Sequence, residues 1–336
     1  MVMLDLNHIF LFIAVISPLA VLARSWRPGT TYRGWRIASF IVLAVTAAAW
    51  LIFPEAAGFI GGGAWFALLF LPAVGLRRMA ELAAQHRFRS ARRLAGLLQF
   101  IHPSEQLRHQ VVVLRSLEAG GNHAFVSQDD MAPARDRPSP LRRAPAVIFF
   151  IVVNILVFLL EISHGEWTRP LTLHRLGALE PAFVLANREY WRLLTALFLH
   201  ADIVHLLFNL FALYVLGPPL ERAIGAARFT ACFLLSGIGS TGGVLLLWMV
   251  GLTQATQLVG ASGSIMGIVG GWAAFLLLHR DAPLARQRLS NVIMIIVIQV
   301  VFDFSTPQVS MGAHLCGLLT GFLLGLVLSP KARPAW

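Results

Sequence analysis

Residues 146–163, AVIFFIVVNILVFLLEIS, form a nearly unbroken apolar run that is long enough to cross a membrane as a helix. Outward from it, further runs of similar character lie at 7–24, 36–53, 57–76, 198–217, 228–250, 259–278, 288–303 and 309–328. Hydrocarbon offers no partner for exposed backbone groups, and these runs lack the period-2 alternation of a membrane barrel. They therefore predict an all-α, polytopic membrane protein with nine spans.

The composition indicates the same environment. Of the 336 residues, 57% are hydrophobic and only 13% are charged, and the mean hydropathy is +0.72. The formal net charge is +11, but the arginines flank apolar runs and form no basic stripe with interleaved aromatics. We therefore expect the lipid bilayer as a partner and no nucleic acid. Cys232 and Cys316 both lie in apolar runs and offer no metal-ligand cluster, so we expect no metal and no cofactor.

The distribution of basic residues between the runs predicts the orientation, because Arg and Lys collect on the cytoplasmic side of a membrane. Basic residues gather in the alternate connections 24–36, 77–143, 222–228 and 280–288 and in the C-terminal tail. The connections around Glu55, at 253–258 and at 305–308 carry none. Only the long connection 164–197 breaks the bias, and its arginines are partly offset by acids. This pattern predicts an outside N-terminus and a cytoplasmic C-terminus.

The chain is expected to divide into five parts. These are three N-terminal transmembrane helices in 1–76, a cytoplasmic amphipathic helical hairpin in 77–118, a flexible linker in 119–145, a membrane domain in 146–328 and a cytoplasmic tail in 329–336. Asp5, with no basic residue before the first run, favours a retained span over a signal peptide. Ala91 and Pro103 have the spacing of a tetratricopeptide unit, but one unit cannot bury its own face, so a membrane-hugging hairpin is favoured.

Polar groups inside the runs are costly, so each is a functional candidate, and four of them stand out. They are His205 and Asn209 in the fifth run, Ser262 in the seventh and His314 in the ninth. Each lies a few positions from the outer end of its run, which predicts a similar depth for all four. A serine, two histidines and an asparagine at one level are the groups that acyl transfer requires.

Each of these candidates also has a structural interpretation. The turn Gly260-Ala261-Ser262-Gly263 is at the start of a predicted helix. Its glycines would let a substrate backbone come close, and the helix N-terminus would favour an oxyanion. In the structural interpretation, Ser262 merely bonds its own backbone. Glycines spaced by four follow in both the seventh and the ninth runs and predict close helix packing. His205 and Asn209 share one helical face, as an oxyanion hole or as a packing pair. His200, one turn further out, is interpreted as structural.

Taken together, three patterns resemble the signatures of rhomboid intramembrane serine proteases, in the same order. They are His200-x4-His205-x3-Asn209, the Gly-x-Ser-Gly of 260–263, and Ala313-His314-x2-Gly317-x3-Gly321. Trp191-Arg192 resembles the Trp-Arg of that family's large first loop. The resemblance covers roughly 146–328 and implies a six-helix core that follows the three added N-terminal helices.

The resemblance also implies the chemistry. Ser262 would be the nucleophile and His314 the base of a dyad without an acidic third member, while His205, Asn209 and the Ser262 N–H would hold the oxyanion. We accordingly expect Asp202 and Asp303, at span ends, to sit in water or bond loops. Met266 stands where the family usually carries an aromatic residue against the catalytic histidine, which leaves the ring's positioning in question.

We therefore expect an intramembrane serine endopeptidase of the bacterial inner (plasma) membrane that cuts transmembrane protein substrates. One alternative is a catalytically inactive rhomboid-like protein that binds membrane clients, although such proteins typically lack the serine or the histidine. Another is a small transporter, whose inverted repeats are not visible in the sequence. The oligomeric state is left open.

Overall fold

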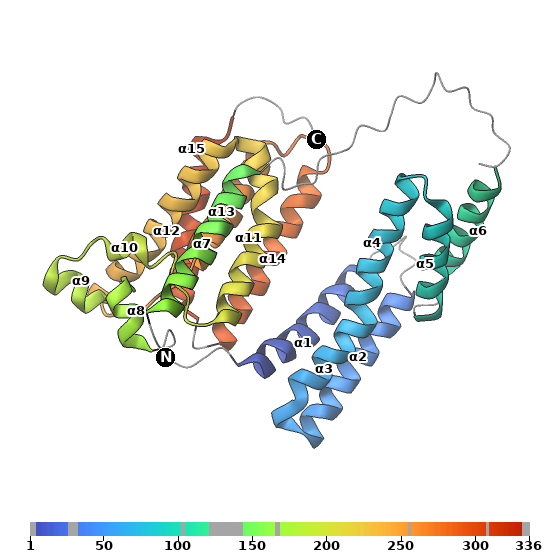
Figure 1. The fold of residues 1–336 in the computed structure, drawn as a ribbon, viewed down its shortest axis with the longest axis horizontal. Coiled ribbons are helices and arrows are strands. Elements are labelled where there is room, and N and C mark those ends of the chain that lie inside the picture. The colour runs from blue at the N-terminus through green and yellow to red at the C-terminus, as the bar shows by residue number, and fades with distance from the viewer. Residues whose placement is uncertain are drawn as a thin grey trace. The chain divides into compact units, whose positions relative to one another are not determined.

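The computed structural model describes residues 5–25, 33–101, 105–120, 144–164, 169–254, 257–306 and 309–330 (Figure 1). Within these ranges the chain is helical, and extended pairing is limited to one isolated bridge between Leu179 and Leu258. The predicted all-α polytopic fold is therefore confirmed.

Eight helical segments in the described ranges are long and apolar enough to cross a membrane. They are α1 (Leu6–Ser25), α2 (Arg33–Ile52), the segment Pro54–Ala84, α7 (Pro145–Ser163), α11 (Ile203–Ile224), α12 (Ala226–Met249), α14 (Ala285–Ser305) and α15 (Met311–Leu328). A shorter apolar helix, α13 (Ser262–Leu278), accounts for the remaining predicted run. These helices belong to two compact units, one within residues 5–135 and one that includes residues 136–336.

The first unit contains the N-terminal spans. Its third span is continuous through η1 (Pro54–Ala56), α3 (Ala57–Trp65), a π-helical turn η2 (Phe66–Phe70) and α4 (Leu71–Ala84). The side chain of Asn7 accepts hydrogen bonds from the N–H groups of Gly58 and Phe59 at 2.8 and 3.2 Å. Because the first N–H groups of a helix lack intrahelical partners, these bonds tie the start of α3 to α1.

The amphipathic helical hairpin predicted in 77–118 follows a longer helix than the sequence indicated. The helix that contains the third predicted run continues beyond residue 76 in α4 to Ala84, and α5 (Phe88–Ile101) and α6 (Glu105–Gly120) follow. A small apolar core joins the three helices, formed by Met79, Leu82, Ala91, Ala95, Leu98, Leu107 and Leu114. Arg92 donates to Glu118 at 2.7 Å, and this bond holds the pKa of that carboxyl below its usual range. Most of the predicted linker 119–145 lies outside the described residues.

The described residues of the second unit include a bundle of six helices, α7 and α11 to α15. In Figure 1 the short helices α8 (Pro170–Leu176), α9 (Pro181–Asn187) and α10 (Arg192–Thr195) lie together beside this bundle, in the loop between α7 and α11. The rings of Phe150 and Phe233 stack at 4.0 Å between centroids in the buried core. This core fixes α7 and α12 against each other and supports the three helices that carry the candidate site.

The fifth predicted run, 198–217, is displaced in the structure. The helix begins at Ile203, because the side chain of Asp202 caps it by accepting from the N–H of His205 at 2.7 Å. It then continues through Pro218 and Pro219 to Ile224. The buried carboxylate of Glu221 in this extension accepts from the first N–H groups of α7, which anchors the turn beyond the prolines.

Candidate active site

The four candidate residues lie near the N-terminal ends of three helices that pack together. His205 and Asn209 are in the first two turns of α11, Ser262 is the first residue of α13, and His314 lies in the first turn of α15. Helix α13 packs against both α11 and α15. The topology therefore brings the starts of all three helices to the same end of the unit.

The glycines of α13 and α15 set how closely these helices approach. A Cβ built on Gly317 would lie 2.2 Å from the carbonyl oxygen of Gly263, and one built on Gly321 would lie 2.0 Å from that of Gly267. No side chain fits at such distances, so the two backbones are in direct contact, as the four-residue spacing predicted. Gly263 directly follows Ser262, and Gly317 is one turn beyond His314, so this seam begins at the two candidate residues.

The turn before Ser262 requires glycine at position 260. Gly260 has φ +121°, and a Cβ there would lie 2.6 Å from Cε1 of His205. Its N–H donates to the carbonyl oxygen of Ala196 at 2.8 Å. The His205 ring therefore lies directly against the turn that leads to Ser262.

The side chain of Ser262 is half-buried at the start of α13. Among the hydrogen bonds of the described residues, none joins its hydroxyl to His314. Catalytic hydrogen bonds are often long before substrate binds and tighten in the reacting complex. Within the described part of the chain the hydroxyl has no other hydrogen-bond partner either.

His314 is buried and bonds instead to Asp303, near the end of α14. Its Nδ1 lies 2.8 Å from Oδ2 of Asp303, and both residues are 5% exposed. The expectation that Asp202 and Asp303 sit in water or bond loops is therefore wrong. Asp202 is buried as the cap of α11, and Asp303 is buried against a histidine, because polar groups removed from water must find partners.

His205 and Asn209 lie one turn apart on α11 and make different contacts. Asn209 is buried and donates through Nδ2 to the carbonyl oxygen of His205 at 2.8 Å, so one amide proton stays available. The ring of His205 meets that of His200 edge-on, with centroids 5.2 Å apart. His200 is fully buried, and its backbone N–H donates to the carboxylate of Glu161, so its contacts are those of a packing residue.

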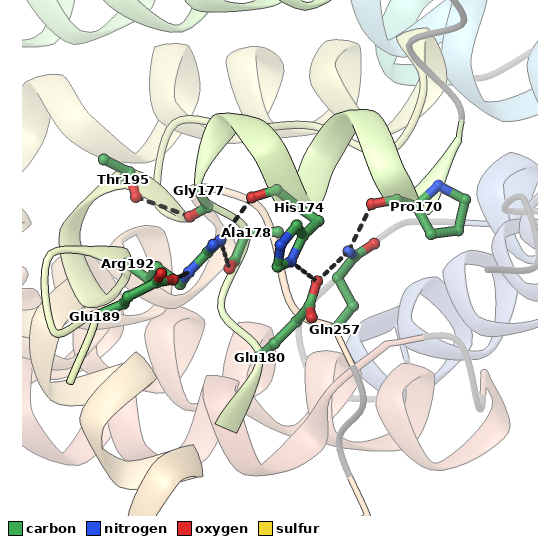
Figure 2. A network of polar contacts seen from close by, with 9 residues as sticks. All are labelled: Pro170, His174, Gly177, Ala178, Glu180, Glu189, Arg192, Thr195 and Gln257. Carbon is green, nitrogen blue, oxygen red and sulfur yellow. Dashed lines mark hydrogen bonds and ion pairs between the residues drawn. The ribbon is translucent and has the colours of Figure 1, made fainter. Parts of the chain in front are cut away.

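A polar network organises the loop between α7 and α11 (Figure 2). The guanidinium of Arg192 donates to the carbonyl oxygens of His174 and Ala178 at 2.7 and 3.0 Å and to the carboxylate of Glu189. It also stacks on the neighbouring Trp191 ring, 4.7 Å from the centroid. Since Arg192 is only 3% exposed and bonds to three residues of this loop, it is a structural centre of the loop.

The same loop holds the segment that leads to Ser262. Leu179 and Leu258 exchange backbone hydrogen bonds at 2.9 and 2.8 Å. Gln257 donates to the carboxylate of Glu180 at 2.7 Å and to the carbonyl oxygen of Pro170 at 2.9 Å (Figure 2). The roles of Glu180 and Gln257 could not be predicted from the sequence, because residues that meet only across two loops leave no periodic pattern. Their bonds fix the backbone segment before Ser262 from outside the helices.

Comparison with known proteins agrees with this architecture. The Rhomboid domain family matches residues 187–331. The "Putative rhomboid protease YdcA" of Bacillus subtilis is 32% identical over 195 residues, which are 57% of this chain and 92% of that protein. "Rhomboid protease GluP" of the same organism is 38% identical over 185 residues, 54% of this chain and 35% of that protein. "RHOMBOID-like protein 6, mitochondrial" of Arabidopsis thaliana is 36% identical over 166 residues, 49% of this chain and 52% of that protein.

The family match falls on the second unit and includes α11, α13 and α15 with their candidate residues. The likeness covers nearly the whole of one relative and about a third and a half of the other two. Together with the helical architecture, it leads to one conclusion: the chain is a multi-pass membrane protein that belongs to the rhomboid family, whose named members include proteases.

Proposed function

We propose that this protein is an intramembrane serine endopeptidase that hydrolyses peptide bonds in or near the transmembrane helices of other proteins. The observation that carries the proposal is the backbone contact of α13 and α15, which begins beside Ser262 and beside His314. It brings a hydroxyl and an imidazole from different helices to one end of the same seam. A pairing of nucleophile and base is the minimum that acyl transfer needs.

In this mechanism Ser262 Oγ attacks the scissile carbonyl while Nε2 of His314 accepts the hydroxyl proton. The tetrahedral intermediate then collapses, the C–N bond breaks, and His314 returns the proton to the leaving amine. A water molecule attacks the acyl-enzyme in the same way, with His314 as base, and Ser262 is regenerated. The two products are a new carboxyl end and a new amino end of the substrate.

The oxyanion would be held by donors that surround the nucleophile turn. The backbone N–H of Ser262 is free of an intrahelical partner because it is at the start of α13. The second amide proton of Asn209 and the ring of His205, which lies against Gly260, complete the proposed set. Such donors are oriented before the reaction begins, and removing one typically costs about 10²–10³ in kcat.

The length of α13 supports cleavage within the membrane. Its 17 residues span about 25 Å, less than the ~30 Å of hydrocarbon, so a helix that ends at the cytoplasmic surface begins below the opposite one. The irregular segment before it would then lie at membrane depth, where backbone groups must be bonded by protein. The bonds from Leu179, Gln257 and Gly260 meet that requirement. A substrate helix would need to unwind locally there, since helical carbonyls are already hydrogen-bonded.

The experiment is proteolysis of a purified single-span substrate by the purified chain in detergent or liposomes. Ser262→Ala and His314→Ala are each expected to lower kcat by at least about 10³-fold. Ser264→Ala is the matched control, because it deletes a hydroxyl two residues along the same helix that has no hydrogen-bond partner among the described residues. A fluorophosphonate should label the parent protein and not Ser262→Ala.

Two results would refute the proposal. Cleavage by Ser262→Ala at the parental rate would exclude this serine as nucleophile. Binding of single-span helices by the purified parent protein, with neither cleavage nor fluorophosphonate labelling, would favour the inactive client-binding alternative.

The proposal includes an orientation with the N-terminus outside and the C-terminus cytoplasmic, based on the arginine-rich alternate connections. Single cysteines introduced at Glu55 and at Arg286, in a chain without Cys232 and Cys316, should differ in labelling by an impermeant maleimide applied to intact cells. Only the cysteine at position 55 is expected to react. The reverse pattern would invert the topology and place the candidate site near the cytoplasm.

A further inference from the structure

The second ring nitrogen of His314 is engaged by a carboxylate that a serine–histidine dyad does not require. Nδ1 of His314 and Oδ2 of Asp303 are 2.8 Å apart, and the side chain of Asp303 is 1% exposed. Asp303 is on α14 and His314 on α15, so the bond joins two successive helices across a short connection. In the described part of the chain no other acid bonds to His314.

The carboxylate is itself held in place. Nε2 of Gln299, one turn earlier on α14, donates to Oδ1 of Asp303 at 2.7 Å and lies 3.4 Å from Nδ1 of His314. One carboxylate oxygen therefore faces the amide and the other faces the imidazole. A group fixed by two partners in a buried place has a single orientation, and it imposes that orientation on the ring.

We propose that Asp303 is a positioning residue for the peptidase reaction and makes the site a Ser262–His314–Asp303 triad in function. The inference rests on the proposed function. Asp303 accepts the Nδ1–H of His314, which leaves the lone pair on Nε2 for the proton of the Ser262 hydroxyl. It then stabilises the imidazolium that forms when that proton is taken up. Asp303 itself stays ionised throughout, and no proton is transferred to it.

The test compares Asp303→Asn with the parent protein in the single-span cleavage assay. The amide keeps the shape of the carboxylate but loses its charge and can donate to Nδ1, which would put the ring proton on the wrong nitrogen. We expect kcat to fall by about 10²–10⁴-fold with KM within about threefold, and the rate of fluorophosphonate labelling to fall in parallel. Asp281→Asn, the same chemical change in the exposed α13–α14 connection, should leave both rates unchanged.

The outcomes separate this inference from the proposed function. Loss of kcat at an unchanged melting temperature supports the positioning role, whereas kcat within twofold of the parent overturns it. If Ser262→Ala abolishes cleavage while Asp303→Asn does not impair it, the protease stands and the triad fails. If Ser262→Ala still cleaves, the proposed function fails, whatever Asp303→Asn does.

A second measurement needs no folded variant at position 303. Nitrogen NMR of the parent protein labelled at histidine, with the His314 signal assigned by its loss in His314→Gln, reports which nitrogen carries the proton in the neutral ring. A proton on Nδ1 supports the proposal. A proton on Nε2 overturns it, because that tautomer cannot act as base toward Ser262.

Discussion

At the scale of single residues, the candidate site depends on a glycine position where a side chain would displace a candidate site residue. Gly260 combines a positive φ with direct contact to the His205 ring, whereas Gly251, in the same α12–α13 connection, has φ +75° and nothing within 4 Å of its would-be Cβ. Both glycines have a positive φ, but only Gly260 has another residue in contact with its would-be Cβ. Comparing them therefore tests the contribution of a proposed oxyanion donor against a position with a positive φ alone.

Gly260→Ala is expected to lower kcat by at least about tenfold, because the methyl group would push His205 from the position it needs. Gly251→Ala should cost only the backbone strain, about 1–2 kcal/mol of stability, with kcat unchanged. Initial cleavage rates and melting temperatures of both variants provide the measurement. Equal kcat losses in the two variants would show that the contact with His205 has no part in catalysis.

At the scale of elements, the seam between α13 and α15 decides whether Ser262 and His314 can meet. The position that a Cβ of residue 317 would take is filled by the backbone of Gly263. A backbone cannot move as a flexible side chain can, so any substitution there must separate the helices. Gly242 on α12 has no atom within 4 Å of its would-be Cβ and provides the comparison.

Gly317→Ala should destabilise the protein by about 1–3 kcal/mol and abolish most cleavage, since the proposed base, His314, is carried on the displaced helix. Gly242→Ala should be neutral or slightly stabilising, because alanine is the better helix former. Thermal unfolding in detergent and cleavage of the single-span substrate measure the two effects. A Gly317→Ala variant with parental stability and rate would disprove the close seam.

The candidate site also depends on the polar network in the loop between α7 and α11. Arg192→Leu would leave the buried carbonyl oxygen of Ala178 without its donor, which costs about 1–3 kcal/mol. It would also remove one of the two donors to the carbonyl oxygen of His174, which keeps the N–H of Gly177. We expect a clear drop in melting temperature and a smaller drop in kcat, because the loop also holds the segment before Ser262. Arg175→Leu removes an exposed arginine of the same loop and should change neither quantity. Identical behaviour of the two variants would exclude the structural role of Arg192.

At the scale of the whole molecule, the sequence predicted the architecture because apolar runs and flanking charges report directly on membrane crossing. Both ends of the fifth helix were misplaced. The helix begins only after Asp202, which caps it, and it continues beyond Pro218 and Pro219, where the carboxylate of Glu221 bonds to the start of α7. Ser262 and His314 could be nominated from their positions in the runs. The bond between Asp303 and His314 could not be predicted, although Asp303 is near the end of α14 and His314 is in the first turn of the next helix, α15.

The division into two units leads to a prediction about what the first one contributes. The relative that is matched over 92% of its length aligns with only 57% of this chain, and the second unit has its own buried core and carries every candidate residue. A chain of residues 144–336 is therefore expected to fold and to cleave the single-span substrate with kcat/KM within about threefold of the full chain. The same chain with Ser262→Ala controls for contaminating proteases. Loss of folding or of cleavage on truncation would mean that the second unit needs contacts from the N-terminal spans in addition to its own core.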